Sequence, residues 1–279
     1  SVFLSACIDM EHKDIIFDGI VNARHLGGMI GCNGRKVKNN LLIRCGDLSR
    51  ASDSDVEKLE REYGVSLVFD FRTDYERDTA PDRSVEGAAN HHINIINTNG
   101  ELWSLLKPQP GDTMSLHDRL LGYVLSGKAS MMAHGFYVSF VADSVSQSNY
   151  SKFFRLIIDD VKKGAVLWHC SQGKDRTGLA AAFLLSALGV DRNSIIDDFE
   201  YSNHAYTNEL ATVRKKVIDA GGSTLELEVV QGLSGVNVNW FIKALDYIDV
   251  NYGGMESYLH NQLKLSDNDL EVLRTRFLE

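Results

Sequence analysis

The chain has 279 residues, of which 44% are hydrophobic, and a formal net charge of −9. That hydrophobic content is enough for a packed core, and the low proline count argues against long disordered linkers. The acidic balance argues against a non-specific nucleic-acid binder, which needs a basic face. It does not exclude a phosphorylated substrate, because a local basic pocket can override the overall charge.

The sequence predicts neither a membrane-spanning segment nor a set of disulfide bonds. No apolar run is long enough to span a bilayer, and residues 1–7 lack the basic start of a complete signal peptide, although a leader can have been removed before Ser1. The cysteines are scattered, with no C-x-x-C pair, at Cys7, Cys32, Cys45 and Cys170. We therefore expect neither a disulfide framework nor a structural zinc site, and a reducing environment fits better.

Short strands alternate with turns in the first hundred residues. Strands are predicted over 15–21, 41–45, 65–71 and 90–96. The first runs into a glycine turn at 22–28. Between the second and third strands, Ser52 precedes a helix over 54–63 that Gly64 ends. A loop opened by Arg72 and Asp74 follows the third strand and is closed by Pro81 and Asp82.

From about residue 100 to 150 the pattern becomes helical. Helices are predicted over 102–106, 116–125 and 130–142, followed by an amphipathic helix over 152–161. Two interpretations have equal weight. The segment is either a helical insertion that covers the ends of the strands as a lid, or an ordinary layer of helices that completes the core.

The last part of the chain begins with a buried strand over 165–168, a polar loop and an apolar helix over 178–188. Further helices are predicted over 192–216, as one or as two, and over 238–250 and 255–263. Ser266 and Asp269 form a capping box for a final helix over 267–277. Strands in the first two thirds and helices at the end indicate a single α/β domain over 1–279.

The polar loop after the 165–168 strand has the features of an anion site. A strand, a tight loop and a helix N-terminus direct backbone amides and the helix dipole at one spot. At that spot Cys170, beside Arg176, is expected to have a thiol pKa below its ordinary value of roughly 8.5. The thiolate can attack a phosphate ester, while the planar Arg176 guanidinium holds two phosphoryl oxygens.

The residues between Cys170 and Arg176 complete that interpretation. We expect the phosphate to be bound by the loop itself, that is by Ser171, Gln172, Gly173, Lys174, Asp175 and Arg176. Gly173 lets the backbone approach the ligand, Lys174 adds a second positive charge, and Asp175 can protonate the leaving oxygen.

Arginine six positions after a cysteine is a weak pattern alone, and the other cysteines serve as internal controls. Position +6 holds Lys13, Lys38 and Ala51 after the other three. A nucleotide-binding P-loop is excluded, because Asp175 rather than Ser or Thr follows the Gly-Lys pair.

The segment His169-Cys-Ser-Gln-Gly-Lys-Asp-Arg-Thr-Gly178 resembles the H-C-x-x-G-K-D-R-T-G signature of a bacterial branch of the protein tyrosine phosphatase superfamily, which includes secreted tyrosine and phosphoinositide phosphatases. Weaker likeness covers nearly the whole chain. It includes Asn22-Ala-Arg-His-Leu-Gly-Gly28, Arg44-Cys-Gly-Asp-Leu-Ser49, Phe69-Asp-Phe-Arg72 with Glu76 and Pro81-Asp82, and the tail from Tyr252 to Asp267. The main departures are His25 and Cys45, where the branch has Asp and Ser.

The resemblance implies a protein tyrosine phosphatase-like fold, with a central, mostly parallel sheet flanked by helices, and a metal-independent reaction through a phosphocysteine at Cys170. It requires no cofactor. In this branch the general acid is the loop aspartate, Asp175, which we favour; in other relatives it comes from a separate loop, for which Asp82 is the candidate.

Supporting roles are less specific. His169 is expected to stiffen the loop by hydrogen bonding. Thr177 is expected to bond the thiolate or to help hydrolysis of the phosphoenzyme, or to cap the helix, and these roles are compatible. Arg72 and Asp70 either buttress the loop or form a surface ion pair. His91 and His92 lack a third ligand, so no metal is expected.

The expected partners are a phosphorylated protein or a phosphoinositide, with inorganic phosphate as product. Hydrolysis of phosphotyrosine-type monoesters is the first prediction, and phosphoinositide or dual-specificity hydrolysis is the alternative. A rhodanese-like sulfurtransferase and a silent phosphate-binding module are less favoured. The protein is expected in the cytoplasm of a bacterium or secreted by one.

Overall fold

The computed structural model describes residues 12–100, 107–114, 118, 119, 122, 126 and 135–279. Its strands are β1 (Lys13–Asp14), β2 (Arg24–His25), β3 (Leu42–Cys45), β4 (Val65–Asp70), β5 (Ala89–His92) and β6 (Ala165–His169). They form one sheet in the order β1-β2-β3-β6-β4-β5. The pairs β1–β2 and β2–β3 are antiparallel and the others parallel, which confirms the predicted α/β class with a mostly parallel sheet.

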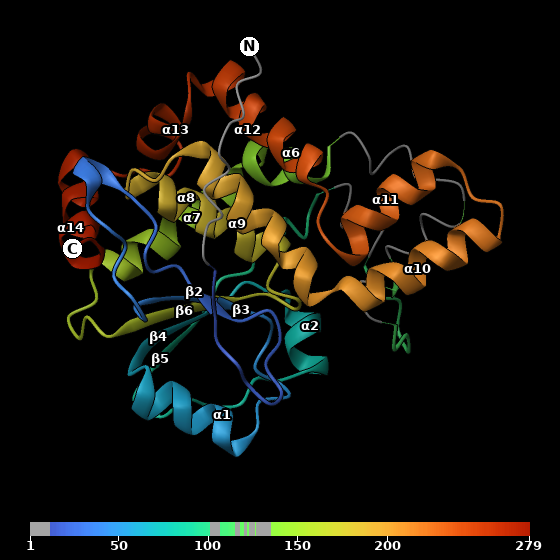
Figure 1. Cartoon of the computed structure of the whole chain (residues 1–279), viewed down its shortest axis with the longest axis horizontal. Coiled ribbons are helices and arrows are strands. Elements are labelled where there is room, and N and C mark those ends of the chain that lie inside the picture. The colour runs from blue at the N-terminus through green and yellow to red at the C-terminus, as the bar shows by residue number, and fades with distance from the viewer. Residues whose placement is uncertain (1–11, 101–106, 115–117, 120–121, 123–125, 127–134) are drawn as a thin grey trace, which may run out of the picture.

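Helices lie on both faces of this sheet. They are α1 (Asp53–Glu57), continued by the π-helical η2 (Lys58–Glu62), then α2 (Asp74–Thr79), α6 (Phe136–Ala142), α7 (Ser144–Ile158), α8 (Asp175–Ala187), α9 (Arg192–Ala205), α10 (Thr207–Asp219), α11 (Thr224–Ser234), α12 (Val238–Tyr252), α13 (Met255–Asn261) and α14 (Asp267–Phe277). A short 3₁₀ turn, η1 (Cys32–Gly34), precedes β3. Figure 1 shows α1 on one side of the sheet and α7, α8 and α9 on the other.

The alternation of side chains along each strand divides the core into two parts. In β6, Val166 and Trp168 belong to the larger cluster, which contains the apolar side chains of α7, α8 and α12. Leu167 between them faces the smaller cluster, together with Leu59 of η2. Because β6 is buried on both faces, it reads as an uninterrupted apolar run, as central parallel strands do.

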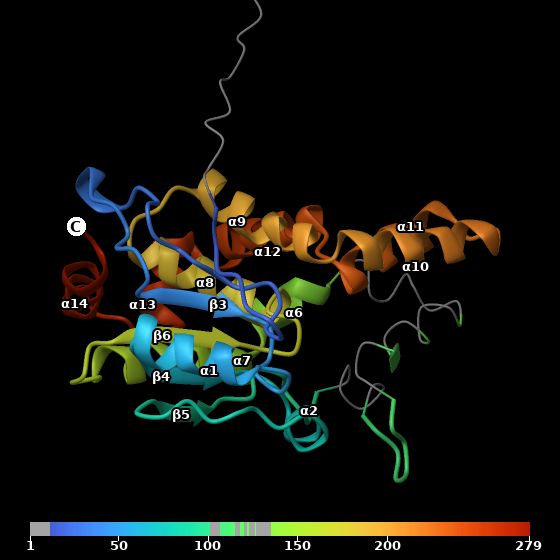
Figure 2. The ribbon, with the colours of Figure 1, turned by 60° about the horizontal axis from the view of Figure 1, so that its bottom comes forward.

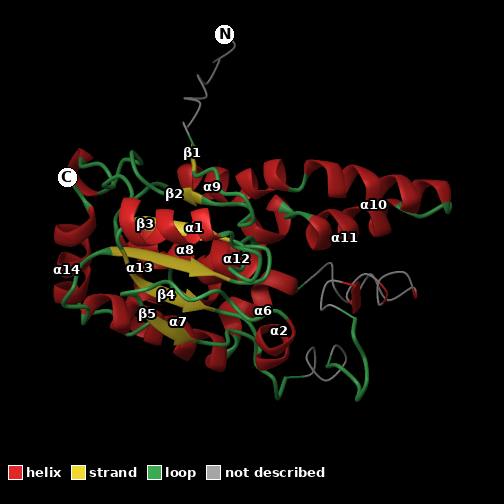
Figure 3. Ribbon diagram, turned by 90° about the horizontal axis from the view of Figure 1, so that it is seen from below, coloured by secondary structure: helices red, strands yellow, loops and turns green. Residues whose placement is uncertain are grey.

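The carboxyl ends of the three central strands lie at one edge of the sheet. His169 at the end of β6 pairs with Cys45 of β3 and with Asp70 of β4. In Figure 2 the strand arrows point toward the side on which α2 and α6 lie, and the pair α10–α11 projects beyond that side, as Figure 3 also shows. Ligands of open parallel sheets bind outside this edge, so the loops there are the place to look for a site.

Two predictions about local structure are wrong for identifiable reasons. Residues 15–21 form a loop rather than a strand, because the amides of Asp18 and Gly19 donate to the buried Asp55 carboxylate at 2.7 and 2.8 Å instead of pairing with a strand. The loop predicted after β4 contains the helix α2, and α11 was not predicted. Both helices begin with a capping box, formed at α2 by Thr73 and Glu76.

Other predicted elements are close to those observed. The 192–216 segment is two helices, α9 and α10, and α14 begins with the predicted capping box of Ser266 and Asp269. The predicted helix over 152–161 is the second half of α7. The helices predicted over 102–106 and over most of 116–125 lie outside the described residues, and that over 130–142 is described only as α6. Among the described helices, none is both long and apolar enough to cross a membrane.

Candidate active site

In the loop between β6 and α8, the carbonyl groups of residues 172 and 173 accept hydrogen bonds from side chains of other segments, on the side that we call the back of the loop. Gln172 O accepts from the Tyr206 hydroxyl at 2.6 Å and from Asn22 Nδ2 at 3.1 Å. Gly173 O accepts from Asn22 Nδ2 at 3.1 Å and from Arg44 Nη2 at 2.9 Å. Because one face of each peptide is fixed in this way, its N–H group is directed to the opposite, concave side of the loop.

The amides on the concave side have no protein acceptor. Within the described residues, the N–H groups of Ser171, Gln172, Gly173 and Lys174 donate to no backbone or side-chain group. Gly173 has a φ of +66°, and a Cβ there would lie 2.2 Å from the carbonyl oxygen of Cys45, so only glycine fits. With the N-terminus of α8 behind it, this loop has the geometry of an anion-binding nest, and its binding of a phosphate stays a prediction.

Cys170 lies at the base of the nest, with only 2% of its surface exposed. Burial opposes ionisation of the thiol, but the neighbouring positive charge of Arg176 favours the thiolate, and the pKa of Cys170 lies below its ordinary value. Thr177 is buried in the first turn of α8, whose N-cap is Lys174, so the predicted helix cap is wrong. The Thr177 hydroxyl has no hydrogen-bond partner among the described residues, so its bond to the thiolate stays a prediction.

Arg176 is fixed by a carboxylate that the sequence analysis assigned no role. Its Nη1 and Nη2 donate to the two oxygens of Glu76, each at 2.8 Å, and the Ser171 hydroxyl donates to Glu76 Oε1 at 2.6 Å. Burial alone would raise the pKa of Glu76, but Arg176 and Ser171 have a larger, opposite effect. The pKa of Glu76 is therefore lowered to about 2. The same carboxylate caps α2 through the Thr73 amide at 2.9 Å. Two signals in the sequence pointed to Glu76: the Thr-x-x-Glu spacing, and its place in the segment that resembles the phosphatase branch.

Asp175 and Lys174 contact each other and two other elements. Asp175 Oδ1 accepts from the hydroxyl of Tyr137 in α6 at 2.6 Å, and Oδ2 accepts from Lys174 Nζ at 3.0 Å. The Lys174 ammonium also donates to the carbonyl oxygens of Leu233 at 2.9 Å and Gly235 at 2.7 Å, at the end of α11. These protein acceptors occupy the Lys174 ammonium, and its predicted contact with a phosphate stays a prediction.

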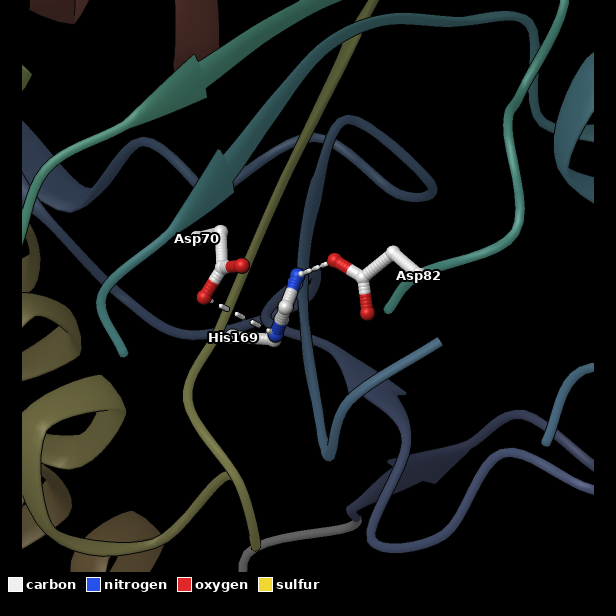
Figure 4. A group of neighbouring side chains, drawn as sticks. All are labelled: Asp70, Asp82 and His169. Atoms are coloured by element: carbon white, nitrogen blue, oxygen red, sulfur yellow. Dashed lines mark ion pairs between the residues drawn. The ribbon is translucent and has the colours of Figure 1, made fainter. Parts of the chain in front are cut away.

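Asp82, the second candidate for the general acid, lies in an ion network beneath the loop. Figure 4 shows His169 between Asp70 and Asp82, with its Nε2 2.8 Å from Asp82 Oδ2 and its Nδ1 4.0 Å from Asp70 Oδ1. Burial lowers the pKa of His169, but Asp82 and Asp70 raise it to about 9. His169 Nδ1 also lies 3.0 Å from the carbonyl oxygen of Cys170, which fits the predicted stiffening of the loop.

The same network decides between two predictions for Arg72. Its Nη2 lies 2.9 Å from both Asp70 Oδ2 and Asp82 Oδ1, and the residue is only 1% exposed, so a surface ion pair is wrong. Asp70, Asp82 and His169 are near enough to one another to share a metal ion. However, Arg72 already pairs with both carboxylates, and the raised pKa of His169 favours an imidazolium, which would balance the remaining negative charge and cannot coordinate a metal. The arrangement suits ion pairing better than a metal centre.

A second ion network lies behind the loop. Arg24 Nε and Arg44 Nη1 donate to the two oxygens of Asp198 at 2.8 and 2.6 Å, and all three side chains are buried. Burial raises the pKa of Asp198, but the two arginines lower it to about 2. Asn22 and the arginines belong to the motifs noted above, whereas nothing in the sequence singled out Asp198, which lies in α9.

The comparisons with known proteins agree with this geometry. A model described as the tyrosine phosphatase family matches residues 15–279. A Cupriavidus necator protein provisionally named a tyrosine-protein phosphatase is 29% identical over 278 residues, covering 98% of this chain and 91% of that protein. A tyrosine-protein phosphatase of Nostoc commune is 26% identical, covering 88% of this chain and 76% of its own.

A third relative is the triple specificity protein phosphatase PtpB of Mycobacterium tuberculosis, which is 26% identical, with 79% of this chain and 84% of PtpB covered. The family match includes the nest, both ion networks and every strand of the sheet except β1. The chain therefore belongs to the tyrosine phosphatase family.

Proposed function

We propose that the protein hydrolyses phosphomonoesters of the phosphotyrosine type, with Cys170 as nucleophile. The observation that carries this proposal is the position of Cys170, a thiol of lowered pKa at the base of a loop whose amides lack acceptors. A phosphoryl group bound by those amides has its phosphorus next to the sulfur. The guanidinium of Arg176, held in one orientation by Glu76, completes the binding of the equatorial oxygens.

The reaction has two steps. The Cys170 thiolate attacks phosphorus, so that an S–P bond forms and the ester P–O bond breaks, while the leaving oxygen takes a proton from the Asp175 carboxyl group. Water then attacks the phosphocysteine and gives a proton to the Asp175 carboxylate as the P–S bond breaks. Inorganic phosphate leaves, and both the thiolate and the protonated acid are restored.

The contacts of the two aspartates support Asp175 as the general acid. Asp175 stands in the first turn of α8, at the mouth of the nest, where a leaving group would lie. Asp82 is engaged by His169, by Arg72 and by the amide of Leu48 at 2.9 Å in the ion network beneath the loop, rather than at the helix N-terminus where Asp175 lies. Asp175→Asn is expected to slow hydrolysis most for poor leaving groups.

The substrate class is proposed from the same contacts. A second cation able to bind an additional phosphate would favour a phosphoinositide, but the Lys174 ammonium is occupied by Asp175 and by carbonyls of α11. We therefore favour phosphotyrosine, although the relative named a triple specificity phosphatase makes wider use of the site the alternative. Rates on phosphotyrosine and phosphoserine peptides and on phosphoinositides, with and without reducing agent, separate the two.

The nucleophile is tested by Cys170→Ser. The variant is expected to bind a phosphotyrosine peptide and to show no turnover above background, because an alcohol in this position is not ionised. Hydrolysis of an aryl phosphate by the pure variant at a rate near the wild type would overturn the proposal. Thiosulfate turnover with a stable persulfide on the wild-type protein would instead support the sulfurtransferase alternative.

A further inference from the structure

Asp175 is held by two side chains, one on each of its carboxyl oxygens. We propose that Tyr137 and Lys174 are positioning residues that fix the Asp175 carboxyl group in the orientation from which it protonates the leaving oxygen. This inference rests on the proposed role of Asp175 as the general acid. It assigns Lys174 a function through Asp175 rather than through the substrate.

Tyr137 is rigid enough to set the direction of its hydrogen bond. Its side chain is completely buried, and its ring makes edge contacts with Phe199 and Phe136, at centroid distances of 5.2 and 5.1 Å, and with Trp240 at 6.4 Å. The hydroxyl donates to Asp175 Oδ1 at 2.6 Å, a short hydrogen bond. Because the ring cannot turn without disturbing this aromatic cluster, the hydroxyl holds Oδ1 in one place.

Lys174 holds the other oxygen from the opposite side. Its ammonium has three protons, and its three shortest contacts are 2.7 Å to Gly235 O, 2.9 Å to Leu233 O and 3.0 Å to Asp175 Oδ2. The two carbonyls lie at the C-terminal end of α11, where the helix dipole favours a positive charge. With 2% of its surface exposed, Lys174 would have to leave all three acceptors to reach a phosphate.

These two bonds leave the carboxyl group able to act as an acid. Each carboxyl oxygen has two lone pairs, and each accepts one bond from the protein, so a proton can still sit on the remaining lone pair. A carboxyl group free to rotate would present that proton in the right direction only part of the time. Fixing both oxygens from α6 and from α11 removes this rotation, which is the kind of preorganisation that general acid catalysis requires.

Tyr137→Phe tests this because it removes one hydroxyl and keeps the ring. We expect kcat/KM, which reports the first step of the reaction, to fall about 10-fold for aryl phosphates whose leaving phenol is weakly acidic, a part of the 10²- to 10⁴-fold that general acids contribute. For the most acidic phenols, which need no proton in that step, kcat/KM stays near the wild-type value. Inhibition by inorganic phosphate is unchanged, because Tyr137 does not contact the phosphate.

Tyr258→Phe is the matched control. Tyr258 is also completely buried, and its hydroxyl donates to the carbonyl oxygen of Val141 in α6 at 2.8 Å, so the variant loses a comparable hydrogen bond on the same helix without touching Asp175. It should lower the melting temperature as Tyr137→Phe does, with no dependence of kcat/KM on the leaving group. The same leaving-group dependence in both variants would overturn the inference.

The double variant Tyr137→Phe/Asp175→Asn separates this inference from the function beneath it. If Tyr137 acts through Asp175, the double variant matches Asp175→Asn alone, whereas independent effects multiply. An Asp175→Asn variant with no leaving-group dependence contradicts the proposed general acid. A clear dependence in Asp175→Asn without one in Tyr137→Phe contradicts only the positioning role.

Lys174→Met gives the corresponding test of the second contact. A positioning role predicts a loss of kcat/KM that depends on the leaving group. A direct contact between the ammonium and the substrate predicts instead the same loss of kcat/KM for every leaving group, which would overturn the assignment of Lys174. Should the methionine variant not fold, Lys174→Gln, which keeps N–H donors for the α11 carbonyls, takes its place.

Discussion

Arg176 and Arg44 both lie buried beside the loop between β6 and α8, and each donates to a buried carboxylate. Arg176, at the mouth of the nest, forms a one-to-one ion pair with Glu76 through two bonds of 2.8 Å. Arg44, behind the loop, shares Asp198 with Arg24. The pair at the mouth is therefore neutral, whereas the group of three behind the loop carries a net positive charge.

This difference in charge indicates that the two arginine–carboxylate groups have different roles. Behind the loop, Arg44 donates to Gly173 O at 2.9 Å, and Asn22, itself bonded to Arg24 at 2.9 Å, donates to the same carbonyl. These contacts fix the backbone that forms the nest and add positive potential beneath it. At the mouth, Glu76 neutralises Arg176 and sets its plane, so that its specificity for a phosphoryl group comes from geometry as well as charge. We therefore expect the Arg176–Glu76 pair to determine the rate of hydrolysis. The network of Arg24, Arg44 and Asp198 is expected to determine the stability of the fold.

Exchanging each arginine for lysine tests this division most strongly. Arg176→Lys keeps the charge next to Glu76 but loses the planar pair of donors, so kcat/KM is expected to fall by about 10²- to 10³-fold. The same exchange at Arg44 is expected to lower the free energy of unfolding and to reduce kcat/KM far less. Steady-state kinetics on an aryl phosphate and urea denaturation of both variants provide the measurements. Equal losses of kcat/KM would remove the distinction.

Asp198→Asn tests the back alone. It leaves two buried arginines without a carboxylate, and the free energy of unfolding is expected to fall by about 2 kcal/mol. Glu57→Gln is the control, because the Glu57–Arg61 pair at 2.8 Å is exposed and such pairs contribute less than about 1 kcal/mol. Urea denaturation measures both variants. A loss no larger for Asp198→Asn than for Glu57→Gln would mean that the network behind the loop does not stabilise the fold.

The pH dependence of stability follows from the lowered pKa values of Asp198 and Glu76, both of about 2. In the unfolded chain these groups titrate near 4, so the stability that they contribute is complete above that pH and is lost as the pH falls toward 2. Each contributes a slope of about 1.4 kcal/mol per pH unit in that window. Asp198→Asn should remove one such slope, and an unchanged acid limb in its denaturation series would contradict this reasoning.

Much of the fold could be predicted from the sequence because its signals are local. The buried run of β6, the polar loop and the capping box of Ser266 and Asp269 need no distant partner to be read. The strand predicted over residues 15–21 is wrong because the deciding contacts are with a residue distant in sequence. Its apolar residues suit a strand, but Asp55, 36 and 37 positions away from the two amides that it binds, draws that backbone into a loop.

The site divides in the same way. Cys170, Asp175 and Arg176 follow one another within a few residues, so their spacing alone suggests chemistry. Glu76 and Asp198 lie far from the loop in sequence, and their importance comes from pairing with arginines in the folded protein. Tyr137 and the carbonyls around Lys174 likewise become visible only when α6 and α11 are placed beside α8.

The smallest expected effect concerns a single hydrogen bond behind the loop. Tyr206→Phe removes the donor 2.6 Å from Gln172 O, but Asn22 still donates to that oxygen at 3.1 Å, so the carbonyl keeps a partner. We expect a loss of about 1 kcal/mol in the free energy of unfolding and a loss of kcat smaller than that of Arg176→Lys. Tyr201→Phe is the control, because Tyr201 lies near the end of α9, just before the C-cap Tyr206, and its hydroxyl donates to Asp14 in an exposed position. If the free energy of unfolding equals that of the control, Asn22 alone is enough to orient the peptide that contains Gln172 O. The hydrogen bond from Tyr206 would then be redundant.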